Sequence, residues 1–313
     1  ELPYCAVAVL GRERLDWPGD VAAAALAGGE HRLDGLARAP GDDYLKRREI
    51  TGADLRAAIL DTATVDPAAG DEVFPLFLDL LAGLHDDLAA KGAPPTPSDF
   101  AFAIGGDLDA RTRRIVDRVV RDYDDPLKAM LQRLGVARRF DRELAAALDQ
   151  TFALGFALRR FDDLAALSLV EAEDGGYALH ARIADCLAAR LDAEARLATH
   201  RRLRDVFTKR AEAAAASGYG RAAVAALGRA VDHTAADPAV DLGKWWAAIF
   251  DAFGPRVGIS LFEPLARRMV EVFDRADGAE RGRGFATGVL GDVRRAQGDL
   301  AGALSAYEAG HAI

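Results

Sequence analysis

Apolar and polar positions form their clearest pattern between residues 126 and 191. Apolar residues recur there at helical spacing in three successive segments, which predicts three helices. Two β-prone runs follow at residues 168–173 and 177–180, and the intervening Asp174-Gly175-Gly176 predicts a hairpin because these residue types tolerate positive φ. A helical pattern resumes at Ile183. Three helices, a two-stranded wing and a closing helix describe a winged-helix domain, which we place at residues 111–195.

The ends of these helices are predicted from residues that favour them. Apolar side chains recur from Leu127 to Leu134, and Gly135 is expected to end the first helix in the left-handed conformation. Asp141 is expected to cap the second helix, since a short side-chain oxygen at this position accepts from a free backbone N–H. Phe161 begins the inner face of the third helix.

The segments that precede this domain are predicted from the same patterns. The continuous apolar run at residues 4–10 is typical of a strand covered on both faces, as in a parallel sheet, and Arg12 follows its carboxyl end. Residues 21–92 carry helical patterns, and the most apolar stretch, at 73–88, contains Pro75. We therefore expect a helical domain at residues 31–110.

A connector and a charged helix lead into the winged-helix domain. Gly92 and the three prolines that follow it predict a stiff, non-helical segment. Arginines alternate with apolar residues from Arg111 to Arg121, which predicts an amphipathic helix. A charge run of this kind usually lies in solvent, so we expect these arginines to form an exposed face.

Residues 196–313 are predicted to form helix pairs. Within the last pair, Gly291, Gly298-Asp299, Ala303 and Tyr307 have the spacing of a tetratricopeptide repeat, in which small residues let two helices approach and an aromatic ring fills the groove. One repeat cannot bury its own apolar face, so the pairs before it are expected to stack with it. A repeat domain of this kind predicts a protein or peptide ligand.

Composition restricts the class of protein. The chain has 313 residues, half of them apolar, and a net charge of −9. The length and apolar content suffice for two or three soluble domains, while the acidic balance disfavours a general binder of nucleic acid or anionic membranes. Cys5 and Cys186 are too few for a disulfide framework or a metal site, and both are expected to be buried thiols in a reducing compartment.

Targeting signals are missing from the sequence. No apolar run reaches the roughly 18 residues that span a bilayer, and no segment resembles a signal peptide, so we expect a cytoplasmic protein. The abundance of Ala, Arg, Gly and Asp favours a bacterial source with a GC-rich genome. Because the chain starts at Glu1 directly before an apolar strand, we expect a fragment or a processed protein.

The end of the wing carries a motif that resembles a known family. Leu179-His180-Ala181 is similar to the Met-His-Asp or Leu-His-Asp motif in the winged-helix domain of STAND-type signalling NTPases, a group that includes the NB-ARC proteins. In that family the His reaches the β-phosphate of bound ADP and holds the switch closed, and the resemblance implies this role for His180. Ala181 stands where the family has Asp, so the acidic half of the latch is missing. The alternative is that His180 only ends an edge strand.

Two further residues match the same family. Arg12 stands at the end of the strand that resembles the family's sensor strand, whose terminal Arg faces the γ-phosphate. Pro75 stands in the segment that resembles the family's Gly-x-Pro, whose Pro packs near the adenine, although Val73 replaces the Gly. The resemblance thus implies nucleotide contacts by Arg12, Pro75 and His180. The alternatives are a surface Arg in a loop and a Pro that simply begins a helix.

The resemblance implies a mainly α chain in four parts. Residues 1–30 would be the residual end of an NTPase α/β domain, followed by the helical domain, the winged-helix domain and the repeats. The sequence contains no Gly-x-x-x-x-Gly-Lys-Ser/Thr and no strand ending in paired acids, so we expect no catalysis and no tight nucleotide binding by this chain alone. ADP or ATP would bind the full-length parent, whose NTPase core is a further expected partner.

The expected function is a nucleotide-dependent switch. In the family, ADP locks a closed monomer, and a ligand on the repeats together with ATP releases an open oligomer. Two alternatives stay open, a transcription regulator with a winged-helix reader and a helical-repeat scaffold without a nucleotide. Against the DNA reader, Arg159 and Arg160 stand beside two aspartates and then only apolar residues, so DNA is not an expected partner.

Overall fold

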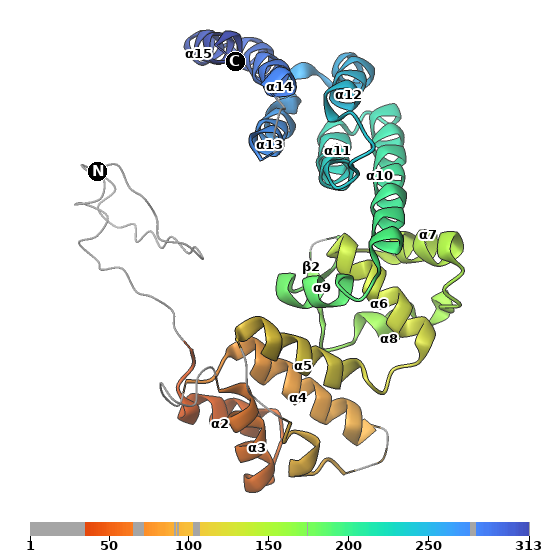
Figure 1. Cartoon of the computed structure of the whole chain (residues 1–313), viewed down its shortest axis with the longest axis vertical. Helices are drawn as coiled ribbons and strands as arrows, with labels where there is room; N and C mark the ends of the chain where they lie inside the picture. Colours follow the sequence, from red (N-terminus) through yellow and green to blue (C-terminus); the bar gives the residue numbers. More distant parts are fainter. Residues whose placement is uncertain are drawn as a thin grey trace, which may run out of the picture.

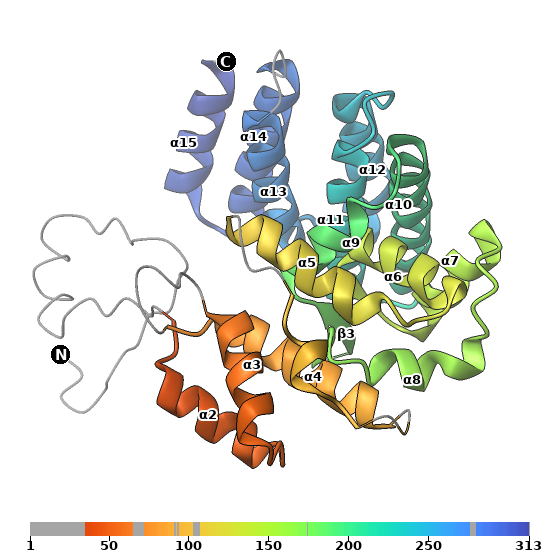
Figure 2. The same cartoon turned by 60° about the horizontal axis from the view of Figure 1, so that its bottom comes forward.

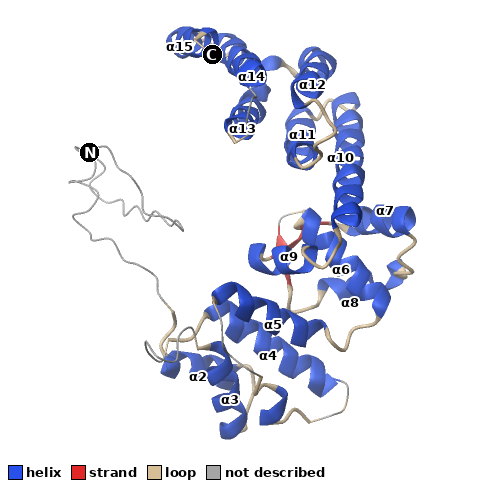
Figure 3. Ribbon diagram, in the orientation of Figure 1, coloured by secondary structure: helices blue, strands red, loops and turns tan. Residues whose placement is uncertain are grey.

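The computed structural model is mainly helical and carries one small antiparallel sheet in the part of the chain that it describes (Figure 1). Figure 3 shows this distribution of helix and strand. The predicted strand at residues 4–10 and Arg12 lie outside the described residues. The described residues are 35–64, 72–90, 92, 94–102, 107–173, 175–275 and 280–312.

The elements follow one another in three groups. The first contains α2 (Arg38–Arg47), α3 (Ala53–Ala63), α4 (Pro75–Ala90), the short 3-10 helix η2 (Pro97–Asp99) and α5 (Leu108–Val120). The second contains α6 (Asp125–Ala137), β1 (Arg139–Phe140), α7 (Arg142–Phe152), η3 (Leu158–Arg160), α8 (Phe161–Ala165), β2 (Val170–Glu173), β3 (Gly176–Leu179) and α9 (Ala181–Ala188). The third contains α10 (Ala193–Ala216), α11 (Gly220–Ala235), α12 (Leu242–Val257), η4 (Ile259–Phe262), α13 (Glu263–Asp274), α14 (Glu280–Ala296) and α15 (Leu300–His311).

The arginines of helix α5 do not all lie in solvent as expected. Arg111 and Arg118 are buried, with 4% and 7% of their surfaces exposed. Arg111 donates to the backbone carbonyls of Thr62 and Thr64, at the end of α3, where helical carbonyls lack partners of their own. Arg118 donates to the backbone carbonyl and carboxylate of Asp99. The prediction was therefore wrong for these two arginines, because their long side chains reach carbonyls on neighbouring segments.

The predicted hairpin is present and belongs to a three-stranded sheet. Its turn contains Gly175 with φ of +81°, and β3 pairs antiparallel with β2 from Val170↔Leu179 onwards. The short β1 pairs with the other edge of β3, which gives the order β1-β3-β2. On this sheet, Tyr177 stacks with Phe140 and lies edge-on to Phe161, with ring centroids 5.9 and 5.5 Å apart. The sequence pattern did not predict β1.

Gly135 does not end the first helix of this group. Helix α6 continues to Ala137, and Arg138 takes the positive φ of 62°. Gly135 instead lies against α9, where a Cβ atom would stand 2.6 Å from the carbonyl oxygen of Ala184. The glycine thus allows two helix backbones to approach, a constraint that sequence spacing does not reveal. The predicted cap at Asp141 is confirmed, since its carboxylate accepts from the N–H of Leu144 at 2.8 Å.

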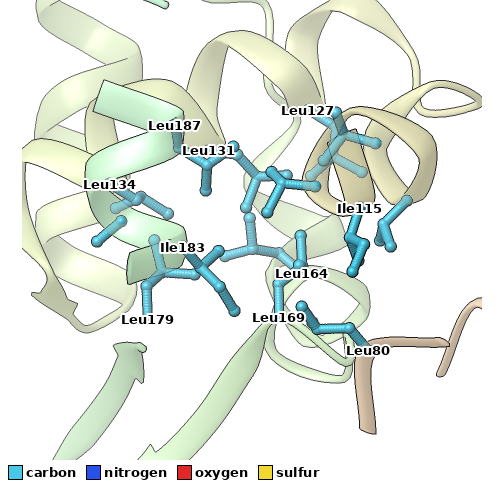
Figure 4. Packing of buried hydrophobic residues seen from close by; sticks show 14 of the residues in the cluster. Leu80, Ile115, Leu127, Leu131, Leu134, Leu164, Leu169, Leu179, Ile183 and Leu187 are labelled. Carbon is cyan, nitrogen blue, oxygen red and sulfur yellow. The ribbon is translucent and has the colours of Figure 1, made fainter. Parts of the chain in front are cut away.

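Two apolar cores meet along α10. The first extends from α2 to the first half of α10 and includes Ala230 of α11. Figure 4 shows its centre, where leucines and isoleucines of α4, α5, α6, α8, β3 and α9 point toward one another. The second extends from the later half of α10 to α14. Leu203 and Phe207 of α10 belong to the first core, and Ala211 and Ala215 belong to the second. One continuous helix therefore contributes to both, and the expected boundary between residues 195 and 196 falls within its first turn.

The helices from α10 to α15 stand side by side (Figure 2). In the last pair, Gly291 of α14 faces the ring of Tyr307 of α15, where a Cβ atom would lie 2.5 Å from a ring carbon. The Tyr307 hydroxyl donates to Asp292 at 2.7 Å, and Asp299 caps α15. The predicted contact between a small residue and an aromatic ring is therefore present in this pair.

Candidate functional site

The structure places the sequence-predicted site residues on separate elements. Pro75 is exposed and is the first residue of α4, where a missing N–H costs nothing. His180 is half-buried and directly precedes α9. Arg12 lies outside the described residues. Neither Pro75 nor His180 lines the cavity described below, and the predicted nucleotide contacts of Arg12, Pro75 and His180 stay predictions.

His180 stands at a well-fixed junction between strand and helix. It follows β3, which is the central strand of the sheet and not an edge strand, while a purely structural role for His180 stays open. Its Nδ1 accepts a hydrogen bond from the N–H of Arg182 at 3.3 Å, which makes His180 the N-cap of α9. With Nδ1 as the acceptor, the neutral ring carries its proton on Nε2. The cap hydrogen bond therefore fixes the orientation of the His180 ring at the start of α9.

Ion pairs hold this junction against α5. Arg182, in the first turn of α9, pairs with Asp109 at 2.7 Å, and Arg190, just beyond the end of α9, pairs with Asp117. All four side chains are at least partly exposed, so each pair contributes little to stability. They lie where α9 packs against α5, the helix that connects the first and second groups of helices.

A cavity of about 650 Å³ lies where α10 begins. Its walls come from the ends of α6 and α9, the first two turns of α10 and the segment after α11. Many of these side chains are small, which leaves the space unfilled. The lining residues are Gly135, Val136, Arg138, Asp185, Ala188, Ala189, Ala193, Arg196, Leu197, His200, Ala236 and Pro238.

The polar part of this wall is mainly cationic. Arg138 pairs with Asp185 at 2.6 Å, and both side chains are more than half exposed. Arg196 is exposed on α10, and no hydrogen bond or ion pair joins its side chain to another residue in the part of the chain that the structure describes. His200 follows one helical turn later and lines the same space. The wall thus offers several N–H donors but only one carboxylate, which is already paired.

His200 also contacts a second, buried histidine. Its Nδ1 lies 3.1 Å from Nδ1 of His233 on α11, and the ring of His233 stacks on Phe207. Burial, His200 and Arg229 lower the pKa of His233 to about 3. Burial and the charge of Arg196 lower the pKa of His200, although Asp237 opposes this shift. Because both pKa values lie below the usual value for histidine, the two rings are neutral near pH 7, and one Nδ1 donates while the other accepts.

A buried carboxylate beside the cavity is fully paired. Asp237 lies between the lining residues Ala236 and Pro238 and accepts two hydrogen bonds from Arg201, at 2.8 and 3.1 Å. Arg204 approaches the same carboxylate at 3.4 Å. The hydrogen bond from Arg201 is the main reason why the pKa of Asp237 falls to about 2. This acid therefore remains ionised, and its charge is balanced by these two arginines.

No family model, curated protein or solved structure matches the chain. The geometry of the site is therefore the basis for its interpretation. Among the described residues, His, Cys, Asp and Glu form no group of three or more that could hold a metal ion. Cys186 is a half-buried free thiol, and Cys5 lies outside the described residues. No helix in the described ranges combines the length and apolar character that a membrane span requires.

Sequence reasoning missed the cavity. Ala193, Arg196, Leu197 and His200 do show the spacing of one helix face, so their common orientation was readable. The hollow, however, depends on small residues at the ends of α6 and α9, which are far from α10 in the sequence. No spacing rule relates these segments to one another.

Proposed function

We propose that this chain is the regulatory and sensor part of a STAND-type signalling NTPase. The observation that carries the proposal is the order of elements around His180. A group of helices, α2 to α5, precedes a compact unit of α6, β1, α7, α8, β2, β3 and α9, and stacked helix pairs follow. This order supports the proposal, because a helical domain, a winged-helix domain and tetratricopeptide-like repeats are expected in this sequence, with the latch His at the end of the wing.

The local geometry supports a latch role for His180. The cap hydrogen bond from the N–H of Arg182 fixes the orientation of its ring, and an imidazole N–H is a type of donor that can bind a phosphate oxygen. ADP held by the nucleotide domain of the full-length protein would bridge to this donor and keep the switch closed. Exchange for ATP would release the winged helix and permit oligomer formation.

Helix α10 supports coupling between the latch and the repeats. Arg133 of α6 donates to Thr199 of α10 at 2.5 Å, and Arg210 of α10 forms a bidentate ion pair with Asp141 of α7. A movement of the winged-helix unit would therefore carry α10 with it. In this proposal a protein or peptide ligand on the helix pairs, and a second copy of the protein, are the partners that respond.

The test is calorimetric titration of ADP and ATP with Mg²⁺ into the protein as its gene encodes it. His180→Ala removes both the ring and the cap, whereas His180→Ser keeps a capping oxygen but is too short to reach a phosphate. If both variants lose about 1–3 kcal/mol of ADP affinity, the amount expected for a hydrogen bond to a charged group, the latch role is supported. Equal ADP affinity in wild type and both variants would refute it.

A second candidate is a helical-repeat scaffold without a nucleotide. The stacked helices α10 to α15 favour it, since such arrays present extended binding surfaces. It takes the place of the first candidate if the natural protein binds neither ADP nor ATP. The DNA reader is disfavoured by the pairing of the basic residues near α8, because Arg160 binds Asp124 at 2.7 Å and Arg142 contacts Asp162 at 3.4 Å.

A further inference from the structure

The cavity at the start of α10 has a cationic wall in a chain whose net charge is −9. Its ionic groups are Arg138, Arg196 and Asp185, which leave one positive charge in excess. The other polar side chain is His200, a neutral ring near pH 7 that adds hydrogen-bonding capacity without charge. We propose that this cavity binds a small anionic ligand, a compound that carries a carboxylate or phosphate group.

Arg196 is the residue that would make the principal contact. A guanidinium presents five N–H donors in a planar fork that matches the oxygens of a carboxylate or phosphate. Arg138 already uses part of its fork on Asp185, while Arg196 has no such acceptor in the described part of the chain. A ligand anion would supply it. The pair of Arg201 and Arg204 is not available for this purpose, because both hold the buried carboxylate of Asp237.

The rest of the wall suits the body of a small molecule. A volume of about 650 Å³ lies within the range of roughly 300–1,000 Å³ that small-molecule sites occupy. Small and apolar residues form most of the surface away from the arginines, including Gly135, Ala188 and Leu197. Such a surface accepts an uncharged or apolar portion without requiring further hydrogen bonds. The ligand is therefore expected to combine one anionic end with a compact, mainly apolar body.

The position of the cavity gives the ligand a structural effect. One wall belongs to α6 and α9, and the other belongs to α10 and the segment after α11. A bound anion would contact Arg138 on the first wall and Arg196 on the second. Binding would thus add contacts between the unit that carries the sheet and the helix pairs. This inference depends on the cavity alone and does not require a nucleotide at His180.

The experiment uses the whole chain and three probes, which are inorganic phosphate, pyrophosphate and succinate. Binding is measured by calorimetry at constant ionic strength in wild type, Arg196→Gln and Arg221→Gln. Arg221 is an exposed arginine of α11 that does not line the cavity, so it controls for the loss of one positive charge. Loss of a charge-assisted hydrogen bond should weaken binding by about 10-fold or more in Arg196→Gln. Arg221→Gln should bind as the wild type does.

A spectroscopic readout keeps the result interpretable. The side-chain NMR signals of His200 should shift on addition of the probe that binds, because this ring lines the cavity. Tighter binding of the phosphates or of succinate identifies the anionic group, and either result supports the proposal. Absence of binding by all three probes at millimolar concentration would overturn it. Equal weakening by the two substitutions, or binding that leaves the His200 signals unchanged, would also overturn it.

Discussion

Replacement of Gly135 by alanine should destabilise the protein, although alanine is the better helix former. In the interior of a helix, Gly→Ala stabilises by about 1 kcal/mol when the site has room. Gly135 has none. A Cβ atom would stand 2.6 Å from the carbonyl oxygen of Ala184, 2.8 Å from the amide nitrogen of Ala188 and 2.9 Å from Cβ of Leu187.

The magnitude follows from which atoms must move. Two of these three contacts are backbone atoms of α9 and its end, so the clash cannot be relieved by rotating a side chain. Overpacking of a core costs roughly 1–3 kcal/mol, and the upper end applies when a helix has to shift. After the gain in helix propensity, Gly135→Ala should lower the free energy of unfolding by about 1–2 kcal/mol.

Gly228→Ala is the matched control. Gly228 lies inside α11, and a Cβ atom there would meet nothing within 4 Å. This change should raise the free energy of unfolding by about 0.5–1 kcal/mol. Both variants are measured by urea unfolding followed with far-UV circular dichroism. An unchanged or increased stability of Gly135→Ala would show that α6 and α9 are not as close as the structure has them.

Two further predictions concern charged and titrating groups. Burial opposes the ionised form of Asp141, but hydrogen bonds from Arg210 and from the N–H of Leu144 outweigh this effect and lower the pKa of Asp141. The contribution of Asp141 to the free energy of unfolding is therefore complete above about pH 4 and is lost in more acidic solution. Arg210→Gln should therefore cost about 1–2 kcal/mol in urea unfolding at pH 7 and less at pH 3, whereas an equal cost at both pH values would contradict the ion pair. The pKa of His233 falls to about 3 in the folded chain, so below about pH 6.5 the unfolded chain binds a proton that the folded chain does not. This difference should lower the free energy of unfolding by about 1.4 kcal/mol per pH unit between pH 6 and 4. His233→Gln should lack this contribution, and an NMR titration of His233 with a midpoint near 6.5 in the folded protein would disprove its burial.

Local features were predictable from the sequence. The hairpin followed from Asp174-Gly175-Gly176, and the cap at Asp141 followed from its position before an apolar helical pattern. The contact between Gly291 and Tyr307 followed from the spacing of one repeat. Each of these depends on residues that are close in the sequence, where φ preferences and helical periodicity determine the outcome. The mainly helical character of the fold has the same origin.

Features that depend on distant segments were not predictable. Strand β1 has only two residues, and it exists because Phe140 pairs with Tyr177 far along the chain. The sequence predicts Arg111 as a surface residue, but in the structure it donates to the backbone carbonyl of Thr62 in α3. The candidate cavity has the same origin, since its shape depends on how the ends of α6 and α9 meet α10. The predicted nucleotide contact of Arg12 stays a prediction, because this residue lies outside the described residues.

Because α10 belongs to both cores, the direction of the helices that follow it is set by the phase of this helix rather than by a linker. An α-helix turns by 100° and advances 1.5 Å with each residue. A single residue inserted between Phe207 and Ala211 would therefore turn the two halves of α10 by about 100° relative to each other, and it would disrupt the pairing of α10 with α11, which contacts both halves. An insertion close to a whole number of turns would keep the two halves of α10 in phase. The number of residues in α10 thus determines how the helices after it are oriented relative to the sheet-bearing unit.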